Sequence, residues 1–385
     1  MNLGSIGGSF AKRVALCLTA ALLVACAGGG DKANPAELAA NTSKLGVRLV
    51  WTARVGAVNF PLNIAVAGVN TATSAAVNIA DGDGVVASFD ASSGRELWRA
   101  QAGKALAAGV GSDGGFATVV TTSNELITFD KGREVWRQKL SNSSYTAPLV
   151  ANGKVFVLGA DRAISAFELT DGKKVWAQKK SAEALTLRQS GVLLMVSDTL
   201  VSSASGRLLG INPLDGNVRW STPIATARGT NEIERLVDLV GRVSNNSEVV
   251  CARAYRVSVG CVNTLRGNLL WTKPAMGQEG VQGDARTLFG AESDGKVIAW
   301  NRVNGERLWQ TDQLLNRNLS APAVLDKAIA VGDSTGFVHF LSKTDGSSLN
   351  RMTTDGSAMA AAPVVVGNTL VVVTRNGGVF GFMPE

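Results

Sequence analysis

The chain has 385 residues, of which 43 are glycines, and 45% of its residues are hydrophobic. This length can bury a large core, and the glycine content favours many short strands joined by tight turns over long helices. The formal net charge of +7 is spread along the chain without a basic run of five or more residues, which argues against a nucleic-acid-binding protein.

Residues 1–25 have the pattern of a signal peptide. A basic pair precedes an apolar stretch at 14–24, which is too short to span a bilayer. The stretch ends in Leu23-Val24-Ala25-Cys26, which resembles a bacterial lipobox, where the cysteine thiol receives a diacylglycerol. The alternative is an ordinary signal peptide that happens to contain a cysteine. We predict that Cys26 is the lipidated first residue of the mature chain.

Residues 26–44 follow as a segment rich in small and polar residues, which indicates a lipidated flexible tether. Ala27 stands where lipoproteins retained in the inner membrane often have an aspartate. Because this aspartate is absent, the resemblance to bacterial lipoproteins favours the outer membrane, with the protein facing the periplasm. We expect ordered structure to begin near Leu45.

From residue 45 to residue 385 one sequence unit recurs with a period of about 40 residues. Each copy alternates apolar residues, turns at an x-Gly pair, and then resumes the alternation. In six copies a tryptophan follows the turn glycine by four residues, and in a seventh copy Asn350 takes its place. The six tryptophans are Trp98, Trp136, Trp176, Trp220, Trp271 and Trp309. This spacing predicts the four-stranded antiparallel blades of an all-β propeller rather than a β-sandwich.

The two ends of the chain carry the two halves of one further unit. Residues 47–51 match the second half of the repeat, and residues 378–382 match its first half. If these terminal strands pair, they complete an eighth blade and leave no sheet edge open. We therefore predict an eight-bladed β-propeller over residues 45–385, with seven units that end near residues 99, 137, 177, 221, 272, 310 and 351.

Two connections are longer than the repeat requires. Residues 179–189 fall between blades three and four and contain Leu185-Thr186-Leu187-Arg188. Residues 227–246 fall in blade five, where Thr230-Asn231 precede a predicted short helix at 232–239. Because the blades themselves close the ring, propellers usually carry their function on such loops.

The sequence offers no residue set for catalysis, cofactor binding or metal binding. The single histidine, His339, lies in an alternating strand and is interpreted as a packing residue. Residues 81–84 resemble part of a calcium loop but lack the closing glutamate, so a hairpin turn is predicted there. Cys251 and Cys261 lie on consecutive predicted strands of blade five, where they form either a disulfide or two buried thiols.

With its lipobox, its glycine–tryptophan repeats and its eight blades, the chain resembles the BamB family of outer-membrane assembly factors over about residues 45–385. The resemblance implies a lipoprotein without catalytic activity or cofactor, in the complex that inserts β-barrel proteins into the outer membrane. The implied partner is BamA, bound through its periplasmic domains, and nascent outer-membrane proteins are a second partner to consider. The propeller itself is expected to be monomeric.

The resemblance also implies which loops contact the partner. The family's Leu-x-Leu-Arg motif matches Leu185, Leu187 and Arg188. An Ile-acid-Arg-Leu segment followed by Asp-x-Asp matches residues 233–240, where Asp238 is present and Val240 replaces the second acid. These motifs lie in the two connections that exceed the repeat.

Two other classes of protein are compatible with parts of the pattern. One is a lipoprotein propeller that serves as the scaffold of another envelope complex. The other is a quinone-dependent periplasmic dehydrogenase, which would need a vicinal cysteine pair and acidic metal ligands. Because Cys251 and Cys261 are not adjacent in the chain, the dehydrogenase is the weaker of the two.

Overall fold

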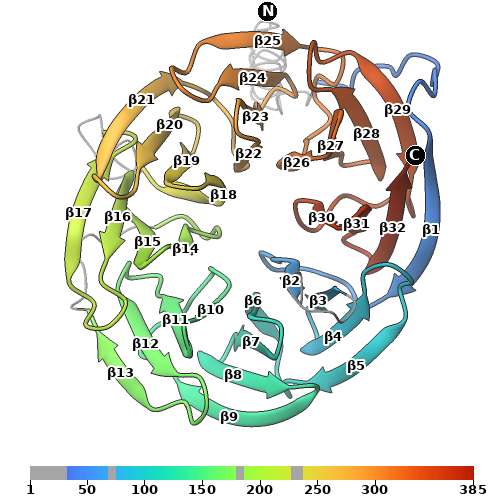
Figure 1. Cartoon of the computed structure of the whole chain (residues 1–385). Helices are drawn as coiled ribbons and strands as arrows, with labels where there is room; N and C mark the ends of the chain where they lie inside the picture. Colours follow the sequence, from blue (N-terminus) through green and yellow to red (C-terminus); the bar gives the residue numbers. More distant parts are fainter. Residues whose placement is uncertain (1–32, 68–74, 179–185, 227–236) are drawn as a thin grey trace, which may run out of the picture. The chain divides into compact units, whose positions relative to one another are not determined.

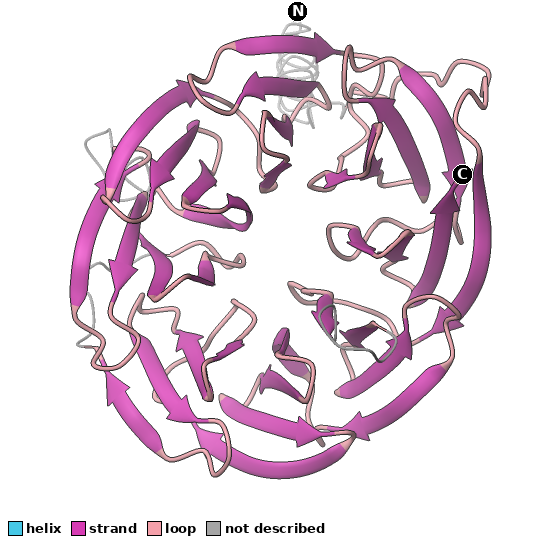
Figure 2. Cartoon of the chain, in the orientation of Figure 1, coloured by secondary structure: helices cyan, strands magenta, loops and turns pink. Residues whose placement is uncertain are grey.

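Eight four-stranded antiparallel sheets are arranged as the blades of a closed ring (Figure 1). The computed structural model describes residues 33–67, 75–178, 186–226 and 237–385, and the ring belongs to the unit Ala36–Glu385. Within these ranges every regular element is a strand (Figure 2). The described residues contain no helix that could cross a bilayer. The prediction of an all-β, eight-bladed propeller is confirmed.

Blades one to four each take four consecutive strands. Blade one has β2 (Ala65–Ala67), β3 (Ala76–Ala80), β4 (Val85–Asp90) and β5 (Glu96–Gln101). Blade two has β6 (Leu106–Ser112), β7 (Phe116–Thr121), β8 (Glu125–Asp130) and β9 (Arg133–Lys139). Blade three has β10 (Leu149–Ala151), β11 (Lys154–Leu158), β12 (Ile164–Glu168) and β13 (Lys174–Ala177). Blade four has β14 (Leu193–Val196), β15 (Thr199–Ala204), β16 (Arg207–Ile211) and β17 (Val218–Pro223).

Blades five to seven continue in the same way. Blade five has β18 (Leu239–Asn246), β19 (Val249–Ala254), β20 (Ser258–Asn263) and β21 (Asn268–Pro274). Blade six has β22 (Val281–Gly283), β23 (Thr287–Ala291), β24 (Val297–Asn301) and β25 (Arg307–Thr311). Blade seven has β26 (Ala323–Val324), β27 (Ala328–Gly332), β28 (Phe337–Ser342) and β29 (Ser348–Thr353).

Blade eight joins the two ends of the chain. It contains β30 (Val364–Val366), β31 (Thr369–Val373), β32 (Gly378–Pro384) and, as its outer strand, β1 (Val47–Arg54). Strand β1 pairs antiparallel with β32 from Val47 opposite Pro384 to Arg54 opposite Gly378. In Figure 1 the blue β1 runs beside the dark red β32. The expected closure by the terminal strands is therefore confirmed.

In six of the eight blades the tryptophan packs closely on the turn glycine of the next blade. Gly172 has a φ of +71°, and a Cβ built on it would lie 2.6 Å from the ring of Trp136. The Trp136 indole also donates a 2.7 Å hydrogen bond to the Leu169 carbonyl in the same turn. Only glycine tolerates both the left-handed φ and the close ring. Similar close approaches join Trp51 to Gly94, Trp176 to Gly216, Trp220 to Gly267, Trp271 to Gly305 and Trp309 to Gly346.

Blade seven departs from this contact because blade eight has no turn between its third and fourth strands. The chain ends there at Glu385 and re-enters at Gly46, whose carbonyl accepts a 2.9 Å hydrogen bond from the Glu385 N–H. Asn350, at the tryptophan position of blade seven, donates a 2.7 Å hydrogen bond to the Leu45 carbonyl instead. The side-chain oxygen Oδ1 of Asn350 accepts a 2.9 Å hydrogen bond from the side-chain amide of Asn41. Blade seven thus lacks the tryptophan at the one place where the next blade has no turn glycine for it to pack on.

Residues 36–45 lie along blade seven before they enter β1. The Ala36 N–H donates a 2.9 Å hydrogen bond to the Leu315 carbonyl, and Arg317 donates to the Ala36 carbonyl over 2.8 Å. At the other end of the segment the Leu45 N–H bonds to the Leu349 carbonyl over 3.2 Å. These contacts hold parts of the segment 36–45 against the ring, whereas the sequence predicts a tether up to residue 44. That the chain before this segment is a lipidated tether stays a prediction.

The short helix predicted at 232–239 is wrong in the part that the structure describes. Residues 232–236 lie outside the described residues, and Leu239 is the first residue of strand β18. The apolar spacing that suggested a helix face instead includes Val237, Leu239 and Val240, all buried against the neighbouring blades.

Candidate functional site

The connections between blades gather on one side of the ring, which we call the loop face. Within an antiparallel blade, the connection between the second and third strands lies on the same side as the exit of the fourth strand. The opposite side, which we call the turn face, carries the two other turns of each blade. Every site residue discussed below that comes from a connection between blades therefore lies on the loop face.

Leu187 and Arg188 lie in the connection from β13 to β14, on the loop face. Leu187 is half-buried, whereas Arg188 is exposed. The guanidinium carbon of Arg188 lies 5.4 Å from the ring centroid of Tyr145, a cation–π contact that orients the side chain. Leu185, the other leucine of the motif, lies outside the described residues. The described part of the motif is a loop with one apolar and one cationic side chain.

Asp238 fastens this loop to the two neighbouring blades. One carboxylate oxygen accepts a 2.8 Å hydrogen bond from the Leu187 backbone N–H, and the other pairs with Arg162 at 2.8 Å. The side chains of Arg162 and Asp238 are 7% and 16% exposed, so the pair is largely removed from water. We call these three groups the Asp238 clasp. Asp238 therefore acts within the protein as a positioning residue for the loop.

Sequence reasoning missed Arg162. It lies in the turn between β11 and β12 of blade three, in a left-handed conformation with a φ of +61°. It is 76 residues from Asp238 in the chain, and no spacing rule connects two turns of different blades. Val240, at the second acidic position of the family motif, is 2% exposed. A carboxylate at this position would require a buried partner.

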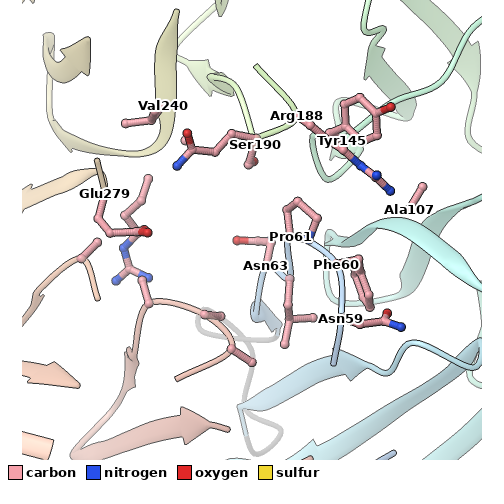
Figure 3. Close-up of a pocket in the computed structure, with 18 of the residues that line it drawn as sticks. Asn59, Phe60, Pro61, Asn63, Ala107, Tyr145, Arg188, Ser190, Val240 and Glu279 are labelled. Atoms are coloured by element: carbon pink, nitrogen blue, oxygen red, sulfur yellow. The ribbon is translucent and has the colours of Figure 1, made fainter. Parts of the chain in front are cut away.

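A cavity of about 730 Å³ opens in the centre of the ring next to this loop. Its wall includes residues from the connections that precede seven of the blades, and blade five contributes residues of strand β18 and of the turn after β19. Every blade of the ring therefore contributes to the cavity. Figure 3 shows Arg188 and Tyr145 on one side of the cavity and Glu279 on the other. Leu187 lines the same cavity, which is therefore continuous with the clasped loop.

The charged residues of the cavity wall are Arg188, Arg242, Arg375 and Glu279. Burial lowers the pKa of Arg242 to about 10. Burial raises the pKa of Glu279, and the charges of Arg375 and Arg253 act against this increase. The pKa shifts of Arg242 and Glu279 thus have burial inside the ring as their main cause. The Glu279 side chain nevertheless remains exposed to the water of the cavity.

Other enclosed charges of the loop face are paired. Arg253, which is fully buried, donates to Glu292 over 2.8 Å. Asp333 accepts hydrogen bonds from Arg317 over 2.7 Å and lies 2.9 Å from the His339 ring nitrogen. Asp333 also caps its own turn, because it accepts the Phe337 N–H over 3.0 Å. His339 is thus part of a buried polar cluster in blade seven and packs within the strand, as interpreted from the sequence.

Two further sequence features are structural. In the turn at 81–84, the Asp81 carboxylate accepts hydrogen bonds from the backbone N–H groups of Asp83 and Val85, at 3.0 and 2.9 Å. The described residues contain no group of three or more His, Cys, Asp or Glu side chains that could hold a metal ion. Cys251 and Cys261 face each other across β19 and β20, and a disulfide joins them with the Cα atoms 4.0 Å apart.

The eight blades, the glycine–tryptophan contacts and the loops around the cavity define a β-propeller protein with its candidate surface on the loop face. A family model described as "Outer membrane protein assembly factor BamB" matches residues 82–311. A protein of Burkholderia pseudomallei with this name is 35% identical over 381 residues, covering 98% of each chain. A Bordetella pertussis protein of the same name is 35% identical over 350 residues, covering 90% of this chain and 89% of its own. The chain belongs to the BamB family.

Solved structures agree with this assignment. The crystal structure of BamB from Moraxella catarrhalis matches with a TM-score of 0.78 and 25% identity, over 88% of this chain and all (100%) of that chain. The quinohemoprotein alcohol dehydrogenase of Comamonas testosteroni matches with a TM-score of 0.65 and 13% identity, over 89% of this chain and 77% of its own. The likeness to the dehydrogenase shows a shared fold.

Proposed function

We propose that the chain is a non-catalytic subunit of the outer-membrane β-barrel assembly machinery, and that its Leu187–Arg188 loop binds the periplasmic domains of BamA. Family membership supports the role in assembly, because the relatives that match nearly the full chain are named assembly factors. The Asp238 clasp is the observation that supports this binding surface. It holds Leu187 and Arg188 on the loop face through the backbone N–H of Leu187, so both side chains are left for a partner.

The Leu187–Arg188 loop is preorganised for binding. A loop that is already ordered loses less conformational entropy on binding than a mobile one. Leu187 can contribute apolar area, and Arg188 can pair with a carboxylate or a carbonyl of the partner while stacked on Tyr145. Interfaces commonly depend on a few such anchors, among which arginine is enriched. The alternative is that Leu187 only packs the seam between blades three and four.

Substitution of the two anchors tests the proposal. Leu187→Ala or Arg188→Ala is expected to weaken binding to the BamA periplasmic domains by roughly 1–3 kcal/mol, while folding stability stays within about 0.5 kcal/mol. If Leu187 is only a core residue, Leu187→Ala will instead cost about 2–5 kcal/mol of stability. Calorimetric titration beside thermal unfolding measures both quantities.

The chain offers a matched control for this experiment. Leu265-Arg266 is an exposed leucine–arginine pair in the turn between β20 and β21, on the turn face. Leu265→Ala and Arg266→Ala remove the same side chains at a distance from the loop and should leave BamA binding unchanged. Equal losses of binding in both pairs would contradict a specific loop surface.

The proposed location is the periplasmic side of the outer membrane, with the chain held there by acyl groups on Cys26. Acyl chains supply membrane affinity that a polar propeller surface lacks. The mass of the mature protein extracted from envelopes tests this directly, since an unmodified Cys26 would exclude the anchor. Nascent outer-membrane proteins are a second proposed ligand.

A further inference from the structure

Three arginines line the central cavity against a single carboxylate. Arg188, Arg242 and Arg375 face the same space as Glu279, which leaves a net charge of two positive units on the wall. Within the described ranges none of these four side chains forms an ion pair. Arg188 contacts the Tyr145 ring, and Arg375 donates one long hydrogen bond of 3.4 Å to the Val58 carbonyl. The cavity therefore has an excess of positive charge, of which Glu279, influenced by the charge of Arg375, offsets one unit at most.

Three arginines with buried side chains outside the cavity have a carboxylate within 2.8 Å: Arg162 with Asp238, Arg253 with Glu292, and Arg317 with Asp333. A fourth, Arg302, forms no ion pair in the described ranges and donates instead to the Ser244 hydroxyl and to backbone carbonyls. A buried charge without a counter-charge costs free energy because it has lost part of its hydration. Among the cavity arginines this cost applies to the partly buried Arg242, whereas Arg188 and Arg375 are exposed to the water of the cavity. Unpaired cations that persist at one place are candidates for binding an anion from outside.

Arg242 gives a second and independent observation. Its backbone has a φ of +60°, a left-handed conformation that is unfavourable for a residue other than glycine. It lies where the pairing of β18 with β19 shifts between Val240 and Ser244, and bulges of this kind redirect side chains. Gly280 leaves room beside it, because a Cβ there would lie 2.1 Å from the Arg242 carbonyl oxygen. The local backbone is thus distorted where the arginine enters the cavity.

The remaining wall suits a peptide better than a free ion. The cavity is in the volume range of sites that enclose ligands of several hundred cubic ångströms, which is far larger than one phosphate or acetate. The two tyrosines of the chain, Tyr145 and Tyr255, both line it. The amide side chains of Asn63 and Gln189 each donate one hydrogen bond to a backbone carbonyl of the protein, and each keeps a second N–H and a carbonyl oxygen that can bond to a peptide unit. Arginine is well suited to bind a carboxylate through two parallel hydrogen bonds.

We propose that the central cavity binds a carboxylate-bearing peptide segment of a protein partner, through Arg242 and Arg375. The carboxylate belongs to an acidic side chain or to a chain terminus, and both present the same group to the arginines. The site opens on the loop face beside Leu187, so one partner can reach both places. The proposal for this site is based on the charged residues of the cavity and does not require that the partner be BamA.

Fluorescence anisotropy with the full-length protein in detergent tests the site. The probe is a fluorescein-labelled eight-residue peptide of glycine, serine and two aspartates, and its match carries asparagine in place of both aspartates. In buffer of about 50 mM salt, where screening is weak, we expect the acidic peptide to bind and the asparagine peptide to bind at least tenfold more weakly. Arg242→Gln and Arg375→Gln should each weaken binding of the acidic peptide about tenfold.

Arg266→Gln on the turn face is the control and should bind as the wild type does. Arg375 is exposed, so its variant keeps the test decisive even if Arg242→Gln fails to fold. Equal binding of the two peptides, or unchanged binding by both variants, would overturn the proposal. Displacement of the acidic peptide by stoichiometric inorganic phosphate would assign the site to a free anion instead. None of these variants alters Leu187, so this result and the BamA titration can fail separately.

Discussion

At the scale of single residues, Asp238 has partners within the protein that the family motif does not imply. Its two carboxylate oxygens accept hydrogen bonds from the Leu187 N–H and from Arg162. Asp238 therefore orders the loop, and its direct contact with a binding partner stays a prediction. Asp238→Asn would keep the size of the side chain and weaken the pair with Arg162, because a neutral amide lacks the charge of the carboxylate.

Asn350 gives the prediction at this scale. It is 4% exposed and satisfies the Leu45 carbonyl, so Asn350→Ala should cost about 1–3 kcal/mol of folding stability through the unpaired carbonyl. Asn350→Trp would restore the repeat, yet it should destabilise the protein at least as much. The indole has no turn glycine to pack on and would displace residues 41–45. Urea unfolding measures both values.

Trp309→Ala is the comparison for this pair of variants. Trp309 packs on Gly346 and donates a 2.8 Å hydrogen bond to the Lys343 carbonyl, so its removal should cost about 3–5 kcal/mol. A stabilising effect of Asn350→Trp would mean that the indole can be accommodated beside residues 41–45 although no turn glycine lies there.

At the scale of elements, strand β28 carries the one histidine of the chain in the cluster with Asp333. Burial lowers the pKa of His339, and the charges of Arg317 and Arg351 lower it further, while Asp333 raises it. Because the unfolded chain binds the proton more readily, stability should fall as the pH drops from 7 through the ordinary histidine pKa of about 6.5. The loss of stability continues until the pH falls below the folded-state pKa.

His339→Gln tests this dependence, because glutamine can still donate to Asp333 but does not titrate. Between pH 7 and pH 5 the melting temperature of the wild type should fall more than that of the variant. Glu279 has a raised pKa and acts with the opposite sign, since protonation favours its folded form. The difference between the two proteins removes this contribution. Parallel pH profiles would show that His339 does not titrate in the folded state in the expected way.

At the scale of the whole molecule, closure of the ring depends on strand β32. This strand pairs with β1 on one side and with β31 on the other, and its Val379 and Phe382 are fully buried. Deletion of residues 379–385 removes these pairings and exposes the apolar edges of two strands. We expect the melting temperature to fall by more than about 10 °C, because loss of buried Phe382 alone typically costs 3–5 kcal/mol.

Deletion of residues 27–33 is the control, since it leaves in place the hydrogen bonds of Ala36 with Leu315 and Arg317. This deletion should leave thermal unfolding, followed by circular dichroism, nearly unchanged. A protein without residues 379–385 that melts with the wild type would be inconsistent with closure by the terminal strands.

The sequence by itself determined the propeller, the number of blades and the place of closure. Each blade is one local unit with its own turn glycine and tryptophan, so the pattern is written within about 40 consecutive residues. The sequence also indicated the connection that carries Leu187 and Arg188, because a connection longer than the repeat requires can be recognised from residue spacing alone. The spacing did not predict strand β18 correctly, since buried positions on a strand at the ring centre can imitate one face of a helix.

Only the tertiary structure decided which distant groups meet. The Asp238 clasp and the three arginines of the cavity each bring together residues from different blades or the connections between them. Likewise, Asn350 is understandable only beside the chain end that blade eight leaves open. Spacing in a repeat specifies contacts between neighbours in the chain, whereas the centre of the ring collects one short segment from each blade. Charge and hydrogen bonding there depend on distances that local sequence patterns do not encode.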